Sequence, residues 1–252
     1  MSGTFFWHDI LTPDVAKTER FYSAVLGWNI TRIPNSNDTY RQVFAGRFPV
    51  GGMMESPRGE HASTSVWRGY VLVDDVDATV EQAVKRGGTI LREPSDIPGG
   101  YGRFAEIADP HGANVIISAP KGEGGPTPEP GTPSTFAWNE LHAGNLDEAW
   151  EFYAAIFGWS KGQAVEMGDA GLYQVFSVGD RDLGGMMSVL PDLPRPQWLY
   201  YINVEAVDAA ADLVTKHGGT IVHGPAQVAG GAWIINAIDP CGAHFGLVAP
   251  KR

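Results

Sequence analysis

The sequence consists of two similar halves. Trp-His-Asp-Ile at residues 7–10 returns as Trp-Asn-Glu-Leu at 138–141, a displacement of 131 positions (138 − 7). Near the end of each half, Asp-Pro-His-Gly at 109–112 is matched by Asp-Pro-Cys-Gly at 239–242. A repeat of this length indicates two copies of one domain, so any difference between the copies is an internal comparison of function.

The repeat divides the 252 residues into two domains of ordinary size. Each copy has roughly 120 residues, which is enough for a hydrophobic core of its own. Between the copies, a stretch rich in Gly and Pro lacks apolar periodicity and is typical of a surface linker. We predict a first domain over residues 1–121, a linker over 122–134 and a second domain over 135–252.

Charge and composition narrow the class of protein. The formal net charge is −11, which repels phosphate backbones and anionic lipids, so we expect neither a nucleic-acid nor a membrane partner. No apolar run is long enough to span a bilayer, and the amino terminus lacks the basic and apolar parts of a secretion signal. Cys241 is the only cysteine, which suits a reducing compartment. We expect a cytoplasmic protein.

The hydrophobic pattern predicts strands and helices in a repeating order. Residues 4–11 alternate as in a strand, and a helix is expected to begin after the N-cap residue Asp14 and to end at Gly27. Residues 145–158 repeat this helix, and a further helix is expected to begin at Asp75. Each copy reads as strand, helix and several strands, followed by the same order again. This predicts an α+β fold built from four βαβββ-like units.

The order of elements and the motifs together resemble the vicinal oxygen chelate superfamily, which comprises glyoxalases, bleomycin-resistance proteins and extradiol dioxygenases. The motifs include Gly-Gly-Met-Met from residues 51 and 184 and Asp-Pro-x-Gly from 109 and 239, and they are most similar to a tandem subgroup with two glyoxalase-like domains. The resemblance implies two mixed sheets that cup a cavity for a small molecule. Because four units are already present, we expect a monomer.

Metal-binding members of this superfamily place His and carboxylate ligands at set positions, and this sequence departs from them. Where the resemblance places the first His, the copies have Trp7 and Trp138. An indole nitrogen has no free lone pair for Zn, Ni or Fe(II). Apart from Glu55 near one position, the remaining positions hold residues that do not complete a metal site: Arg68, Leu199, Ile116, Gly246 and Ser188. We therefore expect no metal and no other cofactor.

An aromatic and sulfur-rich lining takes the place of the metal ligands, which suits a flat apolar or cationic ligand. Strand alternation adds polar side chains on the same face. The predicted ligand-binding residues are Trp7, Asp9, Met53, Arg68, Tyr70, Glu106, Trp138, Met186, Tyr201 and Asn236. Alternatively, the Trp and Met side chains belong to the core and Arg68 with Glu106 forms an ordinary ion pair.

A second set of residues is a candidate catalytic site. Glu140 and His142 share a strand face with Trp138, and His244 has the same parity on its own strand. Two His and one Glu suit a facial metal triad or an acid/base pair. At the equivalent positions the first copy has Asp9, Leu11 and Asn114. Such chemistry would therefore occur once per chain. Alternatively, Glu140 and His142 make ordinary polar contacts.

The sequence leaves open whether the units pair within one copy or across the two copies. Pairing across the copies would group Trp7 and Asp9 with Tyr201 and His244. It would also form a second group: Trp138, Glu140, Arg68, Tyr70 and Glu106. Pairing within each copy would regroup these residues.

Three classes of function follow from these patterns. The favoured function is metal-independent binding of a small aromatic or apolar molecule in clefts between repeated units, as in bleomycin-resistance proteins. The alternative is an enzyme that uses Glu140, His142 and His244, either a glyoxalase-like lyase or isomerase or an accessory enzyme of natural-product oxidation. A protein-interaction module would require a large exposed apolar patch. The expected partner is therefore a small-molecule ligand.

Overall fold

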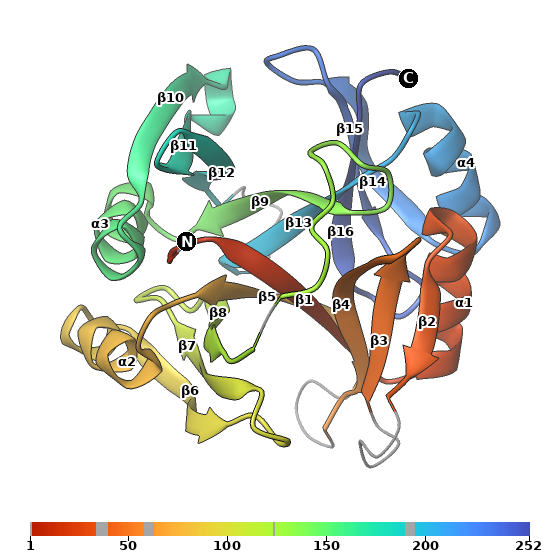
Figure 1. Ribbon diagram of the computed structural model, residues 1–252. Helices are drawn as coiled ribbons and strands as arrows, with labels where there is room; N and C mark the ends of the chain where they lie inside the picture. Colours follow the sequence, from red (N-terminus) through yellow and green to blue (C-terminus); the bar gives the residue numbers. More distant parts are fainter. Residues whose placement is uncertain (1, 34–39, 58–62, 123, 190–194) are drawn as a thin grey trace. The chain divides into compact units, whose positions relative to one another are not determined.

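The structure is a computed structural model that describes residues 2–33, 40–57, 63–122, 124–189 and 195–252. These residues form four α-helices, one short 3-10 turn and sixteen strands (Figure 1). In chain order the elements are β1 (Phe5–Thr12), α1 (Val15–Leu26), β2 (Asn29–Arg32), β3 (Tyr40–Ala45), β4 (Phe48–Glu55), β5 (Val66–Leu72), α2 (Val76–Lys85), β6 (Thr89–Asp96), β7 (Gly102–Ala108), β8 (Asn114–Pro120), β9 (Phe136–Ala143), α3 (Leu146–Phe157), β10 (Ser160–Glu166), η1 (Gly168–Ala170), β11 (Leu172–Val178), β12 (Arg181–Ser188), β13 (Gln197–Asn203), α4 (Val207–Lys216), β14 (Thr220–Gln227), β15 (Trp233–Ile238) and β16 (His244–Ala249). The order strand, helix and three strands thus occurs four times.

The strands form two eight-stranded mixed sheets, one from each copy of the repeat. The first sheet has the order β2-β3-β4-β1-β5-β8-β7-β6, and the second repeats it as β10-β11-β12-β9-β13-β16-β15-β14. The β1 and β4 strands pair in parallel with Asp9 opposite Gly52, and β9 and β12 pair in parallel with Glu140 opposite Gly185. The hairpins beside them are antiparallel. The predicted α+β class and the two mixed sheets are confirmed.

Local sequence signals begin and end the helices. Asp14 accepts a hydrogen bond from the backbone N–H of Lys17 at 2.9 Å and caps α1, and Gly27 ends this helix at φ 66°. In the second copy, Asn145 caps α3 and Gly158 ends it at φ 70°. The left-handed conformation costs a glycine little because it has no Cβ. Both helices therefore form where the sequence predicts them.

The described chain divides into two compact units, and each unit combines parts of both copies. Unit 1 comprises Met1–Phe6, Arg68–Glu123 and Trp138–Leu199, and unit 2 comprises Trp7–Trp67, Gly124–Ala137 and Tyr200–Arg252. Within unit 1, α2 packs against α3, and within unit 2, α1 packs against α4 (Figure 1). Pairing across the copies is therefore the arrangement that this chain adopts.

The repeated Asp-Pro-x-Gly turn connects the two parts of each unit. In unit 2, the Tyr22 hydroxyl donates to Asp239 at 3.3 Å and accepts a hydrogen bond from Trp67 Nε1 at 2.8 Å. In unit 1, the Tyr153 hydroxyl donates to Asp109, also at 3.3 Å. Burial raises the pKa of both aspartates. Because each tyrosine comes from one copy and its aspartate from the other, this contact favours pairing across the copies.

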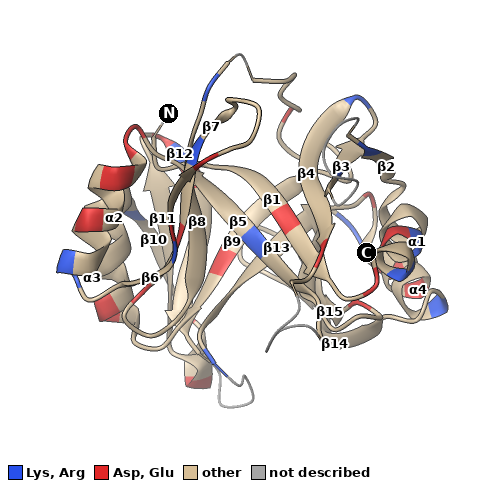
Figure 2. Cartoon of the chain, turned by 90° about the horizontal axis from the view of Figure 1, so that it is seen from below, with Lys and Arg blue, Asp and Glu red and all other residues tan. Residues whose placement is uncertain are grey.

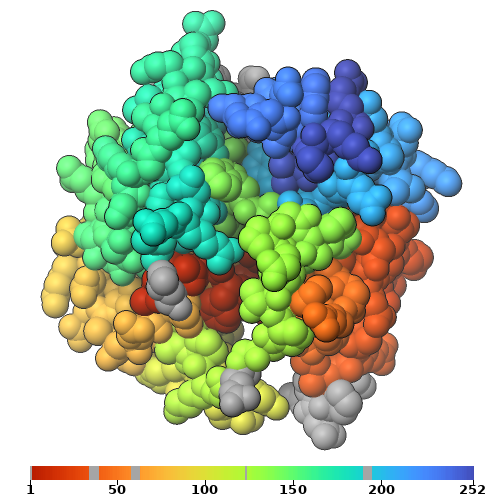
Figure 3. Space-filling view, turned by 45° about the horizontal axis from the view of Figure 1, so that its top comes forward, coloured from red at the N-terminus to blue at the C-terminus, as the bar shows by residue number. Residues whose placement is uncertain are grey.

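The segment between the copies is irregular and lies at the surface. Residues 124–135 contain no helix or strand and are mostly exposed, as the green segment in Figure 3 shows. Its carboxyl end is held in place, because the Ser134 hydroxyl donates to Leu26 O at 2.6 Å and Trp28 Nε1 donates to Ser134 O at 2.7 Å. Position 123, inside the predicted linker, lies outside the described residues.

The hydrophobic pattern does not reveal the edge strand β2. Its four residues are largely exposed and have no apolar alternation, so neighbouring β3 determines its conformation through backbone pairing.

In the part of the chain that the structure describes, no helix is long and apolar enough to cross a membrane.

Candidate functional site

A hydrogen-bonded cluster of Trp7, Asp9 and Tyr40 lies in unit 2. Trp7 and Asp9 are two residues apart on β1 and therefore share a face, and Tyr40 comes from β3. Trp7 Nε1 donates to Asp9 Oδ1 at 2.9 Å and to the Tyr40 hydroxyl at 3.0 Å. The hydroxyl in turn donates to Asp9 Oδ1 at 2.8 Å. The cluster fixes two aromatic rings against a buried carboxylate, which is 1% exposed.

Unit 1 contains the equivalent cluster with one additional member. Trp138 Nε1 donates to the Tyr173 hydroxyl at 2.7 Å, and this hydroxyl donates to Glu140 Oε2 at 3.0 Å. The other carboxylate oxygen, Oε1, lies 3.1 Å from Nε2 of His142. Burial, followed by the nearby Glu140 carboxylate, raises the pKa of Tyr173 well above its usual range, so its hydroxyl keeps its proton and remains a donor.

The Gly-Gly-Met-Met motif makes room for these tyrosines. A Cβ atom at Gly52 would overlap the Tyr40 hydroxyl and the Asp9 carboxylate, and a Cβ atom at Gly185 would overlap the Tyr173 ring. Only glycine allows the tyrosine to lie flat across the sheet at this position. The motif is therefore a requirement of both clusters.

Tyr40 and Tyr173 were not among the residues that the sequence predicted. Most motifs repeat after 131 positions, and that displacement does not align the two tyrosines. The Gly-Gly-Met-Met motif is displaced by 133 positions (184 − 51), and the same displacement relates Tyr40 to Tyr173 (173 − 40). The local shift in the repeat is the signal that identifies this pair.

Arg68 and Glu106, both predicted ligand-binding residues, form an ion pair in unit 1. Arg68 Nη1 lies 3.1 Å from Glu106 Oε2, and the two side chains are 13% and 14% exposed. Asn114 Nδ2 donates to the other oxygen of Glu106 at 3.0 Å. Arg68 Nε is buried and has no hydrogen-bond partner among the described residues. In the same unit, Tyr70 packs edge to face against Phe6, with the ring centroids 6.3 Å apart.

The corresponding residues of the second copy lie in unit 2. Tyr201 is 3% exposed and lies over Gly246, where a Cβ atom would overlap its ring. Asn236 is half-buried, and its Oδ1 has no partner within the described part of the chain. His244 also belongs to unit 2, whereas Glu140 and His142 belong to unit 1. The structure therefore joins two members of the predicted catalytic set and assigns the third to the other unit.

Met53 and Met186 belong to the core. Both are 0% exposed, and in the parallel pairs they lie opposite Ile10 and Leu141, which are also fully buried. Side chains of directly paired residues share a face, so Met53 lies on the face opposite to Trp7. By the same rule Met186 lies on the face opposite to Trp138. Of the two predicted possibilities for these methionines, the structure places them in the core and not in the candidate site.

The side chains at the family's metal positions do not suit a metal ion. The indole nitrogens of Trp7 and Trp138 act as hydrogen-bond donors and have no lone pair to offer. Across the described ranges, no group of three or more His, Cys, Asp and Glu residues could hold an ion. Glu140 and His142 would supply two ligands, which is fewer than a catalytic metal site requires.

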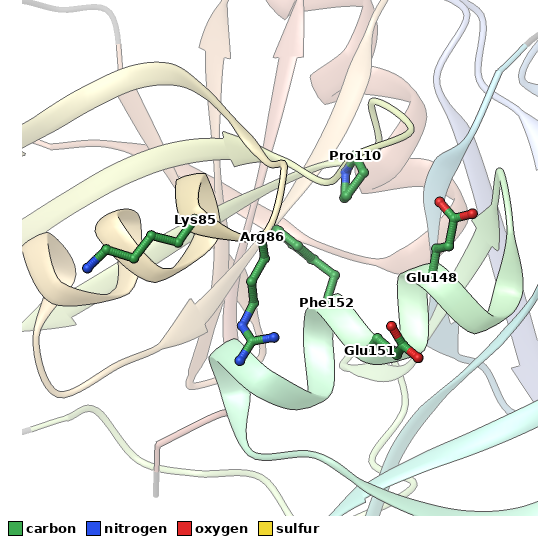
Figure 4. Close-up of a pocket in the computed structure, with 6 residues that line it drawn as sticks. All are labelled: Lys85, Arg86, Pro110, Glu148, Glu151 and Phe152. Atoms are coloured by element: carbon green, nitrogen blue, oxygen red, sulfur yellow. The ribbon is translucent and has the colours of Figure 1, made fainter.

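A separate hollow lies on the helical side of unit 1, with a volume of about 360 Å³ (Figure 4). It is lined by Lys85, Arg86, Pro110, Glu148, Glu151 and Phe152. Glu148 also lies 2.8 Å from Nε2 of His111. Acidic residues are frequent on the neighbouring helices α2 and α3 (Figure 2). This charged hollow has a single aromatic side chain in its lining and does not resemble the two clusters.

The four repeated units and the two mixed sheets define a tandem protein of the glyoxalase-like class. The model of the family described as the Glyoxalase/Bleomycin resistance protein/Dioxygenase superfamily matches residues 5–117 and 135–247. The chain belongs to this superfamily.

Three relatives illustrate the range of proteins that this chain resembles. It is 31% identical over 252 residues to the "Putative glyoxylase CFP32" of Mycobacterium tuberculosis, covering 98% of this chain and 95% of that protein. It is 28% identical to the anthracycline biosynthesis protein DnrV of Streptomyces peucetius, covering 98% and 93%. Over 58% of its length, it is 32% identical to the "Probable lactoylglutathione lyase, chloroplastic" of Arabidopsis thaliana, covering 41% of that protein.

Solved structures share the fold at low sequence identity. The Mn(II)-bound glyoxalase from Novosphingobium aromaticivorans has a TM-score of 0.71 at 16% identity, covering 99% of this chain and 82% of that chain. The 2,3-dioxygenase LapB from Pseudomonas sp. KL28 has a TM-score of 0.67 at 16% identity, covering 98% and 91%. At this level of identity the similarity establishes the fold alone.

Proposed function

We propose that this protein binds a small aromatic or apolar molecule without a metal ion, with one site in each compact unit. The observation that carries the proposal is that hydrogen bonds hold the indoles of Trp7 and Trp138 in fixed positions. Trp7 and Trp138 stand at metal-ligand positions of the superfamily, and each is held by hydrogen bonds to its cluster. An indole that is held in this way supplies a flat apolar surface in one fixed orientation.

A fixed aromatic surface suits this kind of recognition. Stacking or edge-to-face contact between aromatic rings contributes about 0.5–1.5 kcal/mol beyond the burial of apolar area. A side chain that is already ordered loses little conformational entropy when the ligand binds. The half-buried Trp7 and Trp138 have both properties, because the carboxylate and tyrosine of each cluster orient the ring before a ligand arrives.

Calorimetric titration with naphthalene, a flat apolar probe, tests the proposal. The wild-type protein is expected to bind naphthalene at two sites. W7A is expected to weaken the unit 2 site about tenfold and W138A the unit 1 site, since each removes the aromatic wall of its own site. Trp150→Phe is the matched control, because Trp150 lies on α3 with its ring under the Lys161 ammonium at 5.2 Å. Equal binding by all four proteins contradicts the proposal.

Metal analysis supplies an independent test. Protein purified without chelators is expected to contain no stoichiometric transition metal. A stoichiometric Zn, Ni, Mn or Fe ion that is lost in E140Q or H142Q would overturn metal-independent binding.

We also propose that the protein is cytoplasmic and monomeric, as inferred from its sequence. Light scattering after size-exclusion chromatography tests the monomeric state.

A second candidate function is enzymatic, and the contact between Glu140 and His142 favours it, because an imidazole beside a carboxylate can move protons. The resemblance to DnrV and to the Arabidopsis lyase supports the same candidate. Activity on lactoylglutathione, the compound in the name of the Arabidopsis relative, is the assay. Under this hypothesis E140Q abolishes turnover while D9N retains it, and absence of turnover by the wild-type protein contradicts this particular reaction.

A further inference from the structure

His142 carries a buried polar atom that has no partner. Its side chain is 6% exposed, and Nε2 lies 3.1 Å from Glu140 Oε1. The second ring nitrogen, Nδ1, is buried and finds no hydrogen-bond partner in the described residues. Most buried polar groups in folded proteins are paired, because leaving one unpaired costs roughly 1–3 kcal/mol. The unpaired nitrogen is therefore a candidate contact for a ligand.

The neighbouring carboxylate determines which kind of ligand group Nδ1 suits. Glu140 accepts a hydrogen bond from the Tyr173 hydroxyl at Oε2, so this carboxylate acts as an acceptor within the cluster. A carboxylate oxygen 3.1 Å from Nε2 favours the tautomer that carries its proton on Nε2. In the neutral ring, Nδ1 then has a lone pair and accepts hydrogen bonds. The matching ligand group is a donor, such as a hydroxyl or an N–H.

The first copy lacks this acceptor although it has the rest of the cluster. Leu11 occupies the position equivalent to His142, at the usual displacement of 131 (142 − 11). The cluster beside Leu11 is complete, with Trp7, Asp9 and Tyr40 joined by hydrogen bonds. At the position of His142, beside the shared aromatic cluster, only unit 1 therefore has a hydrogen-bond acceptor.

We propose that unit 1 selects an aromatic ligand that bears a hydroxyl or N–H group, which donates a hydrogen bond to His142 Nδ1. This inference rests on the proposed binding function and adds the chemical class of ligand for one of the two units. His142 shares a strand face with Trp138 and Glu140, so a molecule lying against the indole is on the side of the sheet that carries the imidazole. In unit 2 the equivalent residue is Leu11, whose side chain cannot accept this hydrogen bond.

A matched pair of probes tests the selection. Naphthalene and 2-naphthol have the same ring system and differ by one hydroxyl. In calorimetric titrations, the wild-type protein is expected to bind 2-naphthol about tenfold more tightly than naphthalene at one site per chain, which is the effect of one good hydrogen bond. His142→Leu introduces the residue of the first copy and is expected to reduce this preference to less than about twofold, while naphthalene binding is retained.

Two further variants serve as a second test of the acceptor and as a control in unit 2. His142→Phe keeps a flat ring of similar shape but has no nitrogen or oxygen acceptor, so it is expected to lose the preference even if His142→Leu does not fold. Leu11→Met is the control in unit 2, because it changes the equivalent position without adding an acceptor, and it is expected to leave the preference unchanged.

The outcomes separate the two proposals. If the wild-type protein binds both probes equally well, the proposed selection by His142 is wrong and the binding function stands. If His142→Phe folds and keeps the preference for 2-naphthol, the selection by His142 is likewise wrong. If the wild-type protein binds neither probe, the binding function is contradicted and the inference about the ligand fails with it.

Discussion

At the scale of single residues, Gly185 determines the geometry of the unit 1 cluster. A methyl group at this position would overlap the Tyr173 ring, which would have to turn away from Trp138 and Glu140. Gly185→Ala is therefore expected to lower the free energy of unfolding by about 2–3 kcal/mol through overpacking and the loss of two hydrogen bonds. Urea denaturation followed by tryptophan fluorescence measures the change.

A second glycine provides the control for this substitution. Gly124 is exposed, and a Cβ atom there would have no neighbour within 4 Å. Gly124→Ala is expected to change the free energy of unfolding by less than about 0.5 kcal/mol. Equal effects of the two substitutions would show that the close approach of Tyr173 to the sheet does not matter for stability.

The raised pKa of the buried Asp239 carboxyl makes the stability of the protein depend on pH. Burial raises its pKa above the ordinary value of 3.8, so the folded protein favours the protonated form more than the unfolded chain does. The stabilising contribution of this group is present below pH 3.8 and is lost as the pH rises through the raised pKa of the folded state. Asp239→Asn removes this loss, and we expect the variant to gain stability relative to the wild type between about pH 3 and pH 7.

An exposed aspartate gives the opposite sign and serves as the comparison. Hydrogen bonds from Arg103 lower the pKa of Asp77, so its contribution is present above its ordinary pKa and is lost as the pH falls. Asp77→Asn is expected to lose stability relative to the wild type as the pH rises. Urea titrations of both variants at a series of pH values are the measurement. The same pH trend in both variants would contradict the assignment of Asp239.

At the scale of elements, α4 differs from the other three helices at its start. The N-cap residue of α2 is Asp75, whose side chain accepts from Ala78 N at 3.0 Å, whereas the N-cap residue of α4 is Ala206, which has no capping side chain. Ala206 has φ −149° and ψ 134°, close to the backbone conformation of Asp75. Ala206→Asp is therefore expected to raise the free energy of unfolding by about 1 kcal/mol.

The reverse substitution in the first copy checks the size of this effect. Asp75→Ala removes an existing cap and is expected to lower the free energy of unfolding by about 1 kcal/mol. Thermal and urea denaturation of both variants give the comparison. If Asp75→Ala is destabilising and Ala206→Asp has no effect on the free energy of unfolding, the missing cap does not limit the stability that α4 contributes.

Elements with a strong local signal could be predicted from the sequence. The helices over residues 15–26 and 146–157 follow from an Asp or Asn cap, apolar residues at helical spacing and a terminal glycine. The edge strand β2 has no such signal, because pairing with β3 determines it. The Met side chains of Gly-Gly-Met-Met could be assigned to a face only from the register of β4 against β1, which the sequence does not specify.

At the scale of the whole molecule, neither copy of the repeat is a compact unit by itself. Tyr22 of the first copy bonds Asp239 of the second, and Tyr153 of the second bonds Asp109 of the first. Residues 1–121 and 135–252, expressed separately, are therefore expected to yield no stable folded monomer. When mixed, they are expected to form a one-to-one complex.

Size-exclusion chromatography with light scattering, together with circular dichroism, tests this expectation. Mixing the two halves is expected to restore a cooperative unfolding transition, because both parts of each unit are then present. A monomeric fragment of residues 1–121 that unfolds cooperatively alone would show that contacts within one copy are sufficient for folding.

The sequence by itself determined the duplication, the α+β class, the main helices and the replacement of His by Trp7 and Trp138, because these depend on local patterns and on the identity of single residues. Only the tertiary structure decided which parts pair, that Tyr40 and Tyr173 complete the clusters, and that His244 belongs to a different unit from Glu140. These outcomes depend on contacts between residues far apart in the chain, and such contacts leave no periodic pattern in the sequence.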